Sequence, residues 1–306
     1  MPTAAFLSPH LDDAAFSCGG LMARLANADW QVVHVTLFAA TVPDPSGFAL
    51  ECQLDKGLEL DVDYMSLRRD EDREFTGRIG ASEVVHGPFP EAPHRGYSSP
   101  EALFGSILEE DSVFEPLCSY LRALLREHAP ELLVAPQAVG EHVDHVQLAK
   151  AVADVSSLET CPPLVWYRDA PYVIEHPDAH SPFPHIGNLD PLAINIEPVL
   201  QQKLSAAAAY ESQLELQFAR RFSDREWAST DSHGAGNRDS ENCETRGTGE
   251  IAMRRALSHL AREEGRRVQP GSEGRNLHDH VPGREGGPLP AERFRADTGV
   301  TRLLDV

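Results

Sequence analysis

Hydrophobic residues in the first 170 positions fall into two kinds of stretch: short apolar runs and longer segments with apolar residues at helical spacing. The short runs predict strands, because a strand buried on both faces is almost continuously apolar. An apolar residue at every third or fourth position predicts an amphipathic helix instead. The expected strands are 3–8, 31–40, 82–87, 131–137 and 163–169, and the expected helices between them are 13–28, 66–81, 111–130 and 143–157.

This alternation predicts a Rossmann-like α/β fold, in which helices cover both faces of a mostly parallel sheet. We expect residues 1–170 to form the catalytic core and residues 171–306 to complete the fold as a smaller C-terminal α/β extension. Residues 229–250 contain almost no large apolar side chain and predict a flexible insert. Around this insert we expect a strand at 191–197, a long helix at 198–222 and a further helix at 251–265.

Composition and charge narrow the range of partners. The 306 residues carry a formal net charge of −21, from 27 Lys and Arg against 48 Asp and Glu. This balance argues against nucleic acids and anionic membrane surfaces, which attract basic proteins. No apolar run is long enough to span a membrane, and no basic region precedes an apolar stretch at the N-terminus, so we expect a cytoplasmic protein. The five cysteines include no C-x-x-C pair, which favours free thiols.

Two groups of polar residues stand at predicted junctions between a strand and a helix. His10, Asp12 and Asp13 follow the first strand, and the segment from His142 to His145 follows strand 131–137. Ligands of parallel α/β sheets bind outside the carboxyl ends of the strands, so we expect both groups to face one crevice.

A divalent metal explains this combination of imidazole and carboxylate groups, which together suit zinc. A catalytic zinc ion keeps three protein ligands beside a water molecule, and His10, Asp13 and His145 make such a set. The remaining carboxylate, Asp12, is then placed to act as general base. The other two members of the second group supply a second proton-transfer residue, His142, and its orienting carboxylate, Asp144.

Simpler interpretations exist for each of these residues. Asp12 or Asp13 alone suits a helix N-cap. A serine nucleophile is disfavoured because the chain has no G-x-S-x-G turn. Gly19 and Gly20 do not form a dinucleotide-binding G-x-G-x-x-G and instead indicate close backbone packing within a helix. The His-Asp-His run at 278–280 lies in a Gly-, Pro- and Arg-rich tail and is expected to be a solvated loop.

Two loops, at about 39–66 and 87–110, are longer than simple connectors. The second contains a His-Arg-Gly-Tyr run and is predicted to be an ordered substrate loop. Arg95 in this run is the candidate substrate contact.

Several of these segments resemble one known family. Pro9 to Asp13 and His142 to His145 are similar to the P-H-x-D-D and H-x-D-H motifs of the PIG-L/LmbE-like zinc-dependent N-acetylglucosaminyl de-N-acetylases. Residues 68–81 resemble the helix of that family that begins with Arg-x-x-Glu, and 167–173 and 208–213 look like weaker shared segments. The resemblance covers roughly residues 3–225 and does not extend to the segments 229–250 and 265–290.

The resemblance implies one Zn²⁺ per chain, held by His10, Asp13 and His145. It also implies that Asp12 is the general base, and that His142 stabilises the oxyanion and protonates the leaving amine. Asp144 is implied as the partner of that histidine. Arg68 is similar to an arginine that contacts sugar hydroxyls or phosphate in some members, although an ion pair on the helix surface with a nearby acidic residue explains it equally well.

The function implied is hydrolysis of an N-acetyl or other N-acyl group on an amino sugar or glycoside, an amide hydrolase activity of the EC 3.5.1 type. The substrate is then a small N-acylated sugar or glycoconjugate, and the oligomeric state, including a homo-oligomer, stays open. The nearest alternative is a zinc amidase that acts on a sugar–thiol conjugate or on a longer N-acyl chain of a secondary metabolite. Two further classes also stay open: a metal phosphoesterase and a catalytically silent metal- or sugar-binding protein.

Overall fold

The computed structural model describes residues 1–157, 161–225, 244–267, 276–277 and 291–296. The described strands are β1 (Thr3–Ser8), β2 (Gln31–Thr36), β3 (Glu83–His86), β4 (Leu132–Pro136), β5 (Leu164–Tyr167), β6 (Asp190–Asn195), β7 (Asn276–Leu277) and β8 (Ala291–Ala296). The longer described helices are α1 (Asp13–Asn27), α2 (Gly47–Leu54), α3 (Tyr64–Ile79), α5 (Phe114–His128), α6 (Val143–Ser156), α9 (Leu200–Ala207) and α11 (Glu244–Arg267). Short turns of helix are η1 (Ala92–Arg95), α4 (Pro100–Leu103), α7 (Tyr172–Glu175), α8 (Pro184–Gly187), η2 (Glu197–Val199), α10 (Glu211–Leu214) and the π-helical η3 (Glu215–Arg220).

The strands form one eight-stranded sheet in the order β3-β2-β1-β4-β5-β8-β6-β7. The pairs from β3 through β5 are all parallel, whereas β8 runs antiparallel to its two neighbours. The predicted fold class, a mostly parallel α/β sheet covered by helices, is therefore confirmed.

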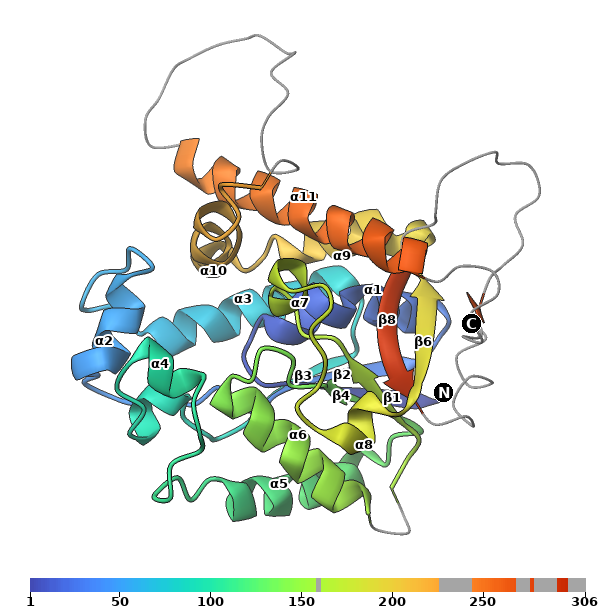
Figure 1. Ribbon diagram of the computed structural model, residues 1–306, viewed down its shortest axis with the longest axis horizontal. Coiled ribbons are helices and arrows are strands. Elements are labelled where there is room, and N and C mark those ends of the chain that lie inside the picture. The colour runs from blue at the N-terminus through green and yellow to red at the C-terminus, as the bar shows by residue number, and fades with distance from the viewer. Residues whose placement is uncertain (158–160, 226–243, 268–275, 278–290, 297–306) are drawn as a thin grey trace, which may run out of the picture.

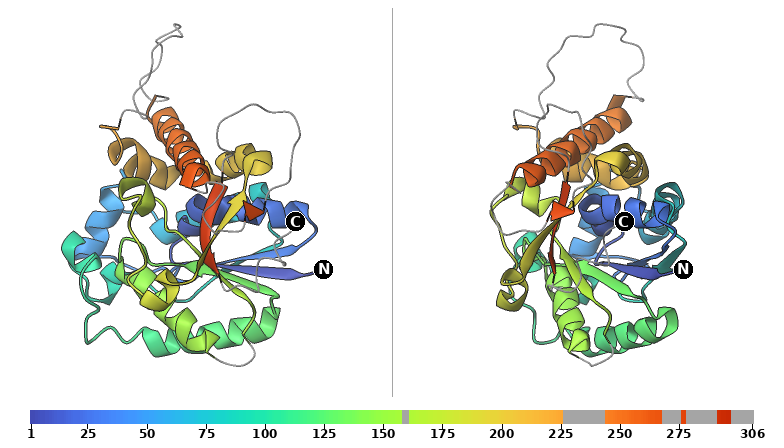
Figure 2. Two further views of the ribbon diagram at one scale, coloured as in Figure 1. Left: turned by 45° about the vertical axis from the view of Figure 1, so that its right-hand side comes forward. Right: turned by 90° about the vertical axis from the view of Figure 1, so that its right-hand side faces the viewer.

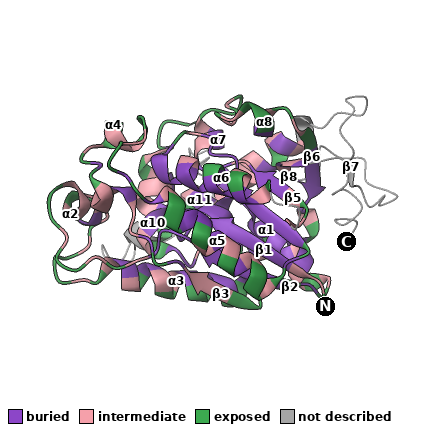
Figure 3. Ribbon diagram, turned by 90° about the horizontal axis from the view of Figure 1, so that it is seen from below, coloured by how far each residue is buried: buried purple, intermediate pink, exposed green. Residues whose placement is uncertain are grey.

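Helices lie on both faces of this sheet (Figure 1). Alternate residues of β1 show why: Ala4 and Phe6 belong to the core beneath α1, α3 and α9, whereas Ala5 and Leu7 belong to the core beneath α5 and α6. The turned views show the same layers, with α11 and α9 on one side and α5 and α6 on the other (Figure 2). Seen from below, the central strands are buried along their length (Figure 3), as a sheet covered on both faces requires.

The C-terminal portion continues the same sheet through β6 and β8 but differs from the sequence prediction in two places. The expected single helix at 198–222 is broken: α9 ends at Ala207, and α10 begins at Glu211. Helix α11 starts at Glu244, so residues 244–250 of the expected insert are helical. The rest of the expected insert and the run at 278–280 lie outside the described residues.

Helix α1 is kinked at Cys18, and β8 supplies the groups that stabilise the kink. Glu292 accepts hydrogen bonds from the backbone amides of Gly20 at 2.8 Å and Leu21 at 2.9 Å. The Nζ atom of Lys203 on α9 lies 2.6 Å from the same carboxylate and 3.4 Å from the carbonyl of Ser17. These contacts satisfy backbone groups that the kink removes from the regular helical pattern.

Gly20 is necessary for this arrangement. A Cβ atom at this position would lie 2.6 Å from Cγ2 of Ile196 and 2.7 Å from Oε1 of Glu292, whereas one at Gly19 would meet nothing closer than 3.4 Å. The sequence predicts close packing at Gly19 and Gly20, and the structure shows it at Gly20. Among the described residues, no helix has both the length and the apolar character that crossing a bilayer requires.

Candidate active site

The loop between β1 and α1 holds the first group of polar residues in a fixed turn. The hydroxyl of Ser8 donates to the carbonyl of His10 at 2.5 Å and accepts from the backbone amide of Ala14 at 3.0 Å. Asp13 accepts from the backbone amide of His10 at 2.8 Å. Asp12 stands at the N-cap position, yet its side chain makes no capping hydrogen bond. Helix capping therefore does not account for its carboxylate.

The second group lies at the start of α6. His142 is the N-cap residue, and its Nδ1 accepts from the backbone amide of Asp144 at 3.2 Å. Because an accepting nitrogen carries no proton, we infer that the neutral ring of His142 is protonated on Nε2. The strands β1 and β4, which precede the two groups, are parallel neighbours. Both groups consequently lie at one edge of the sheet, as the sequence predicts.

Three predicted metal ligands converge at this edge. Asp13 Oδ2 lies 3.1 Å from Nδ1 of His10 and 3.2 Å from Nε2 of His145. Ligand atoms of a tetrahedral zinc site with bonds of 2.0–2.1 Å are about 3.3 Å apart. The Nε2 atom of His145 is buried and makes no regular hydrogen bond among the described residues, although Asp13 Oδ2 lies 3.2 Å away. These observations fit a divalent metal.

A further histidine is close to the same point. His10, His142 and His145 place one ring nitrogen each within 4.8 Å of one another, a grouping able to hold a metal ion. The ring centroids of His10 and His142 are 4.9 Å apart.

Two buried carboxylates orient the predicted ligand rings from behind. Asp169 follows β5, and its Oδ1 lies 2.7 Å from Nδ1 of His145. Asp144 lies 2.9 Å from Nε2 of His10 and accepts from the backbone amide of Ala92 at 3.0 Å. Carboxylates behind metal-binding histidines fix the orientation of the ring and raise its basicity.

The partner of Asp144 therefore differs from the one that the family resemblance implies. Its carboxylate contacts His10, and only its backbone amide contacts His142. The Asp144 carboxylate is fully buried, and Arg95 at 2.6 Å and the backbone amide of Ala92 at 3.0 Å hold it in this position.

Arg68 and Asp12 form a buried pair beside the histidines. Arg68, on α3, donates from Nη2 to Oδ1 of Asp12 at 3.1 Å and from Nη1 to Glu91. Only 4% of Arg68 is exposed, so it is not part of a surface ion pair. Its Nε atom is buried and has no hydrogen-bond partner in the described part of the chain.

The histidine and carboxylate cluster opens into a cavity of about 520 Å³. His10, Asp12, Asp13 and His142 lie on one side of it. A second cavity, of about 530 Å³, adjoins it and shares Cys52, Glu91 and Pro93 in its wall. Together these cavities leave room for a substrate larger than one sugar ring.

Arg95 has a different environment from the one expected of a substrate contact. It donates to both oxygens of Asp111 at 3.1 Å, to Asp144 at 2.6 Å and to the carbonyl of Pro90 at 2.7 Å. It does not line the cavity beside the histidines. The guanidinium thus links the loop after β3 to the carboxylate behind His10, and substrate binding by Arg95 stays a prediction.

Burial and neighbouring charges give the two aspartates different protonation behaviour. Burial raises the pKa of Asp12, and the charge of Arg68 offsets this only in part. Burial also acts on Asp13, but the charges of His145 and His10 hold the pKa of this carboxyl well below its usual range. Burial and the neighbouring His10 lower the pKa of His142 to about 3. The adjacent carboxylates therefore occupy distinct environments, as a division of roles requires.

Sequence reasoning alone did not identify several residues of this site. Asp169 lies in the weakly similar segment 167–173, and its position just after the strand β5 is the sequence feature that indicates a site residue. Glu91, Phe104 and Tyr172 also line the cavity. Glu91 and Phe104 lie in the predicted substrate loop 87–110, and Tyr172 begins the short helix α7, but no regular spacing marks these three residues individually.

The fold and the site together define a class of protein. A mostly parallel α/β sheet carries a histidine and carboxylate cluster, suited to a metal ion, at the ends of its central strands. A second carboxylate and a ring N–H donor stand beside that cluster. Such an arrangement is typical of metal-dependent hydrolases.

Comparison with known proteins identifies the family. The family model described as PIG-L, GlcNAc-PI de-N-acetylase, matches residues 5–156. The 2'-N-acetylparomamine deacetylase of Streptomyces fradiae is 31% identical over 266 residues, which are 84% of this chain and 87% of that protein. The chain belongs to the PIG-L family, and the predicted family is confirmed. These relatives are deacetylases, that is, amide hydrolases.

Solved structures show the same fold at lower identity. A pseudoaglycone deacetylase of an antimicrobial reagent has a TM-score of 0.68 at 20% identity, with 96% of each chain covered. The zinc-inhibited form of a teicoplanin deacetylase has a TM-score of 0.67 at 20% identity and covers 97% of this chain and 99% of that one.

Proposed function

We propose that the protein is a zinc-dependent de-N-acetylase that hydrolyses the N-acetyl group of an amino sugar, with one zinc ion per chain. The observation that carries this proposal is the convergence of His10, Asp13 and His145 on one point, with Asp12 beside it in the cavity. The matching donor set, the burial of Nε2 of His145 without a regular hydrogen bond and the carboxylates behind the rings support a metal at this point.

The protein residues divide the chemistry among them. A zinc ion held by these residues would lower the pKa of its bound water towards 7 and would polarise the carbonyl group of the substrate. Asp12 is the general base, since it lines the cavity and its second oxygen is not used by Arg68. His142, which we infer to carry its only ring proton on Nε2, donates a hydrogen bond to the developing oxyanion, and the departing amine receives the proton that Asp12 removed from the water.

We further propose that the substrate is an aminoglycoside-type amino sugar bearing an N-acetyl group. The name of the 31% identical relative, 2'-N-acetylparomamine deacetylase, supports this substrate class. The two adjoining cavities, of about 520 and 530 Å³, support a substrate with more than one ring.

The test is release of free amine and acetate from 2'-N-acetylparomamine and from N-acetylglucosamine by the purified, zinc-loaded protein. Asp12→Asn should lower kcat by about 10²–10⁴-fold while bound zinc, measured by elemental analysis, stays at one equivalent. His145→Ala should lose the zinc. Full activity in Asp12→Asn, or stoichiometric zinc in His145→Ala, would contradict the assigned roles. Activity restricted to long-chain N-acyl substrates would refute the deacetylase assignment.

A further inference from the structure

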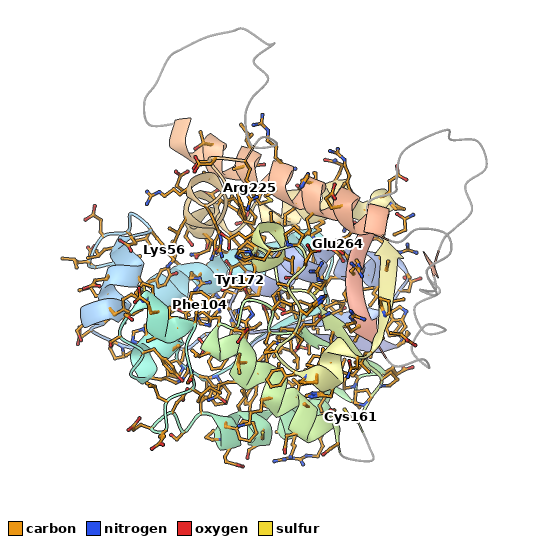
Figure 4. The ribbon with its side chains drawn as sticks, viewed as in Figure 1. Lys56, Phe104, Cys161, Tyr172, Arg225 and Glu264 are labelled. Carbon is orange, nitrogen blue, oxygen red and sulfur yellow. The ribbon has the colours of Figure 1, made fainter. Side chains whose placement is uncertain are left out.

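Two aromatic side chains, Phe104 and Tyr172, line the cavity and take no part in the proposed proton transfer. Phe104, at the end of α4, lines the cavity and is 46% exposed. Its ring centroid lies 5.4 Å from that of His142 and 5.9 Å from that of Tyr172, with interplanar angles of 86° and 74°. Figure 4 shows Phe104 and Tyr172 next to each other at the front of the molecule.

Tyr172 is held rigidly behind Phe104. A Cβ atom at Gly140 would lie 2.4 Å from Cγ of Tyr172, so the tyrosine ring packs directly on a glycine with φ of +93°. The guanidinium of Arg221 lies 5.1 Å from the centre of the same ring and is fixed by two hydrogen bonds of 2.6 Å to Glu175. The tyrosine ring is therefore a firm support for its neighbour.

The loop that carries Phe104 is also anchored. Tyr97 donates to Asp111 at 2.9 Å and accepts from the backbone amide of Leu108 at 3.2 Å, and Arg95 binds the same aspartate. Ala92 and Tyr97 pack with Val143 of α6 in a small separate core. The position of Phe104 is thus set by the fold, although almost half of its surface is open to the cavity and solvent.

Other parts of the cavity lining are polar. They include side chains with hydrogen-bonding ends: Lys56, Gln213, Gln217 and Arg220. A sugar ring has a matching asymmetry, because its C–H bonds form an apolar face and its hydroxyl groups form a polar rim. A cavity lined by an open aromatic ring and by polar side chains can contact both the apolar face and the polar rim of a sugar ring.

We propose that Phe104, supported by Tyr172, packs against the C–H face of the sugar ring and is a specificity-determining residue of the deacetylase. This inference rests on the proposed function and adds to it the residue that selects a cyclic substrate. Phe104 acts on binding and orientation, whereas proton transfer belongs to Asp12 and stabilisation of the oxyanion to His142. An acyclic N-acetylated amine presents no such face and gains nothing from the contact.

The experiment compares Phe104→Ala with the matched control Leu54→Ala. Leu54 is 41% exposed on α2 and does not line either cavity. With N-acetylglucosamine as substrate, Phe104→Ala should raise KM about tenfold, with kcat within about twofold of the wild type. Phe104→Trp should retain the wild-type KM, Leu54→Ala should change neither constant, and the KM for N-acetylethanolamine should stay the same in all variants.

A second measurement does not depend on turnover. Isothermal titration of glucosamine into metal-depleted protein should show the same tenfold weakening for Phe104→Ala. An unchanged KM and unchanged glucosamine affinity would overturn the proposal, as would an equal effect on N-acetylethanolamine or a fall in kcat alone. If the wild type releases no amine from any N-acetylated sugar, the proposed function fails, and the glucosamine titration still decides whether Phe104 contacts a sugar.

Discussion

Replacing Gly20 by alanine tests how the C-terminal strand is attached to the catalytic core. The new Cβ would lie 2.6 Å from Cγ2 of Ile196 and 2.7 Å from Oε1 of Glu292. Ile196 is fully buried and cannot move into solvent, and Glu292 is held by two backbone amides and by Lys203. The substitution therefore forces a shift in either the sheet or the kink of α1.

The expected change in the free energy of unfolding results from two opposing effects. Overpacking of a well-filled core costs typically about 1–3 kcal/mol, and three contacts below 3 Å with fixed atoms of Ile196 and Glu292 place this site at about 3 kcal/mol. Alanine in a helix is favoured over glycine by about 1 kcal/mol. We expect Gly20→Ala to lower the free energy of unfolding by about 2 kcal/mol.

Urea denaturation followed by circular dichroism measures this change, and the neighbouring glycine provides the control. A Cβ at Gly19 meets nothing closer than 3.4 Å, and one at Gly77 on α3 meets nothing within 4 Å. Gly19→Ala and Gly77→Ala should therefore be neutral or stabilising by up to about 1 kcal/mol. If Gly20→Ala proves as stable as Gly19→Ala, Glu292 and Ile196 do not pack tightly against α1 and the reasoning is wrong.

Three further changes test the surroundings of the site. Asp169→Asn should weaken zinc binding by about 10–100-fold in a competitive chelator titration, because the His145 ring would lose its carboxylate partner. Unchanged zinc affinity would contradict this role. Arg95→Met should lower the free energy of unfolding by about 3 kcal/mol, since it leaves two buried carboxylates without their cation; a raised KM with unchanged stability would instead support Arg95 as a substrate contact. Burial raises the pKa of Glu71 to about 7, against the usual 4.5. The folded state therefore binds a proton on Glu71 more tightly than the unfolded state does, and it loses stability as the pH rises from about 4.5 to 7. Glu71→Gln removes this loss, and its stability relative to the wild type should improve between pH 5 and pH 8; a constant difference would exclude a raised pKa.

Local patterns predicted the central elements of the fold. The strand β1, the helix α5 and the helix α6 lie close to their expected bounds, because their apolar residues repeat with the period of the element itself. The parallel arrangement then brought His10, Asp13 and His145 to one edge, although 132 residues separate the last two in the sequence (145 − 13). Two short motifs and one rule of sheet topology were enough for this part of the site.

The break between α9 and α10 and the strand β8 were not predicted. The segment 198–222 has helical periodicity throughout, and nothing in its spacing marks the turn before Tyr210. That turn is favoured by a long-range contact: the hydroxyl of Tyr210 donates at 2.6 Å to Asp72, which is buried on α3. Burying a charged carboxylate requires such partners, wherever in the sequence they come from.

The sequence by itself determined the α/β layers, the edge of the sheet on which the site forms and the residue types gathered there. Spacing and periodicity reveal these features because they concern residues that are close in the sequence or that follow neighbouring parallel strands. Only the tertiary structure decided that Asp144 supports His10, that Asp169 supports His145 and that Glu292 stabilises α1. Each of these contacts is made by a single side chain to a distant part of the chain, and Glu292 lies 271 residues from Leu21, whose backbone amide donates to it. Burial then makes each of them obligatory, since a buried polar group must find a partner and only the folded chain provides one.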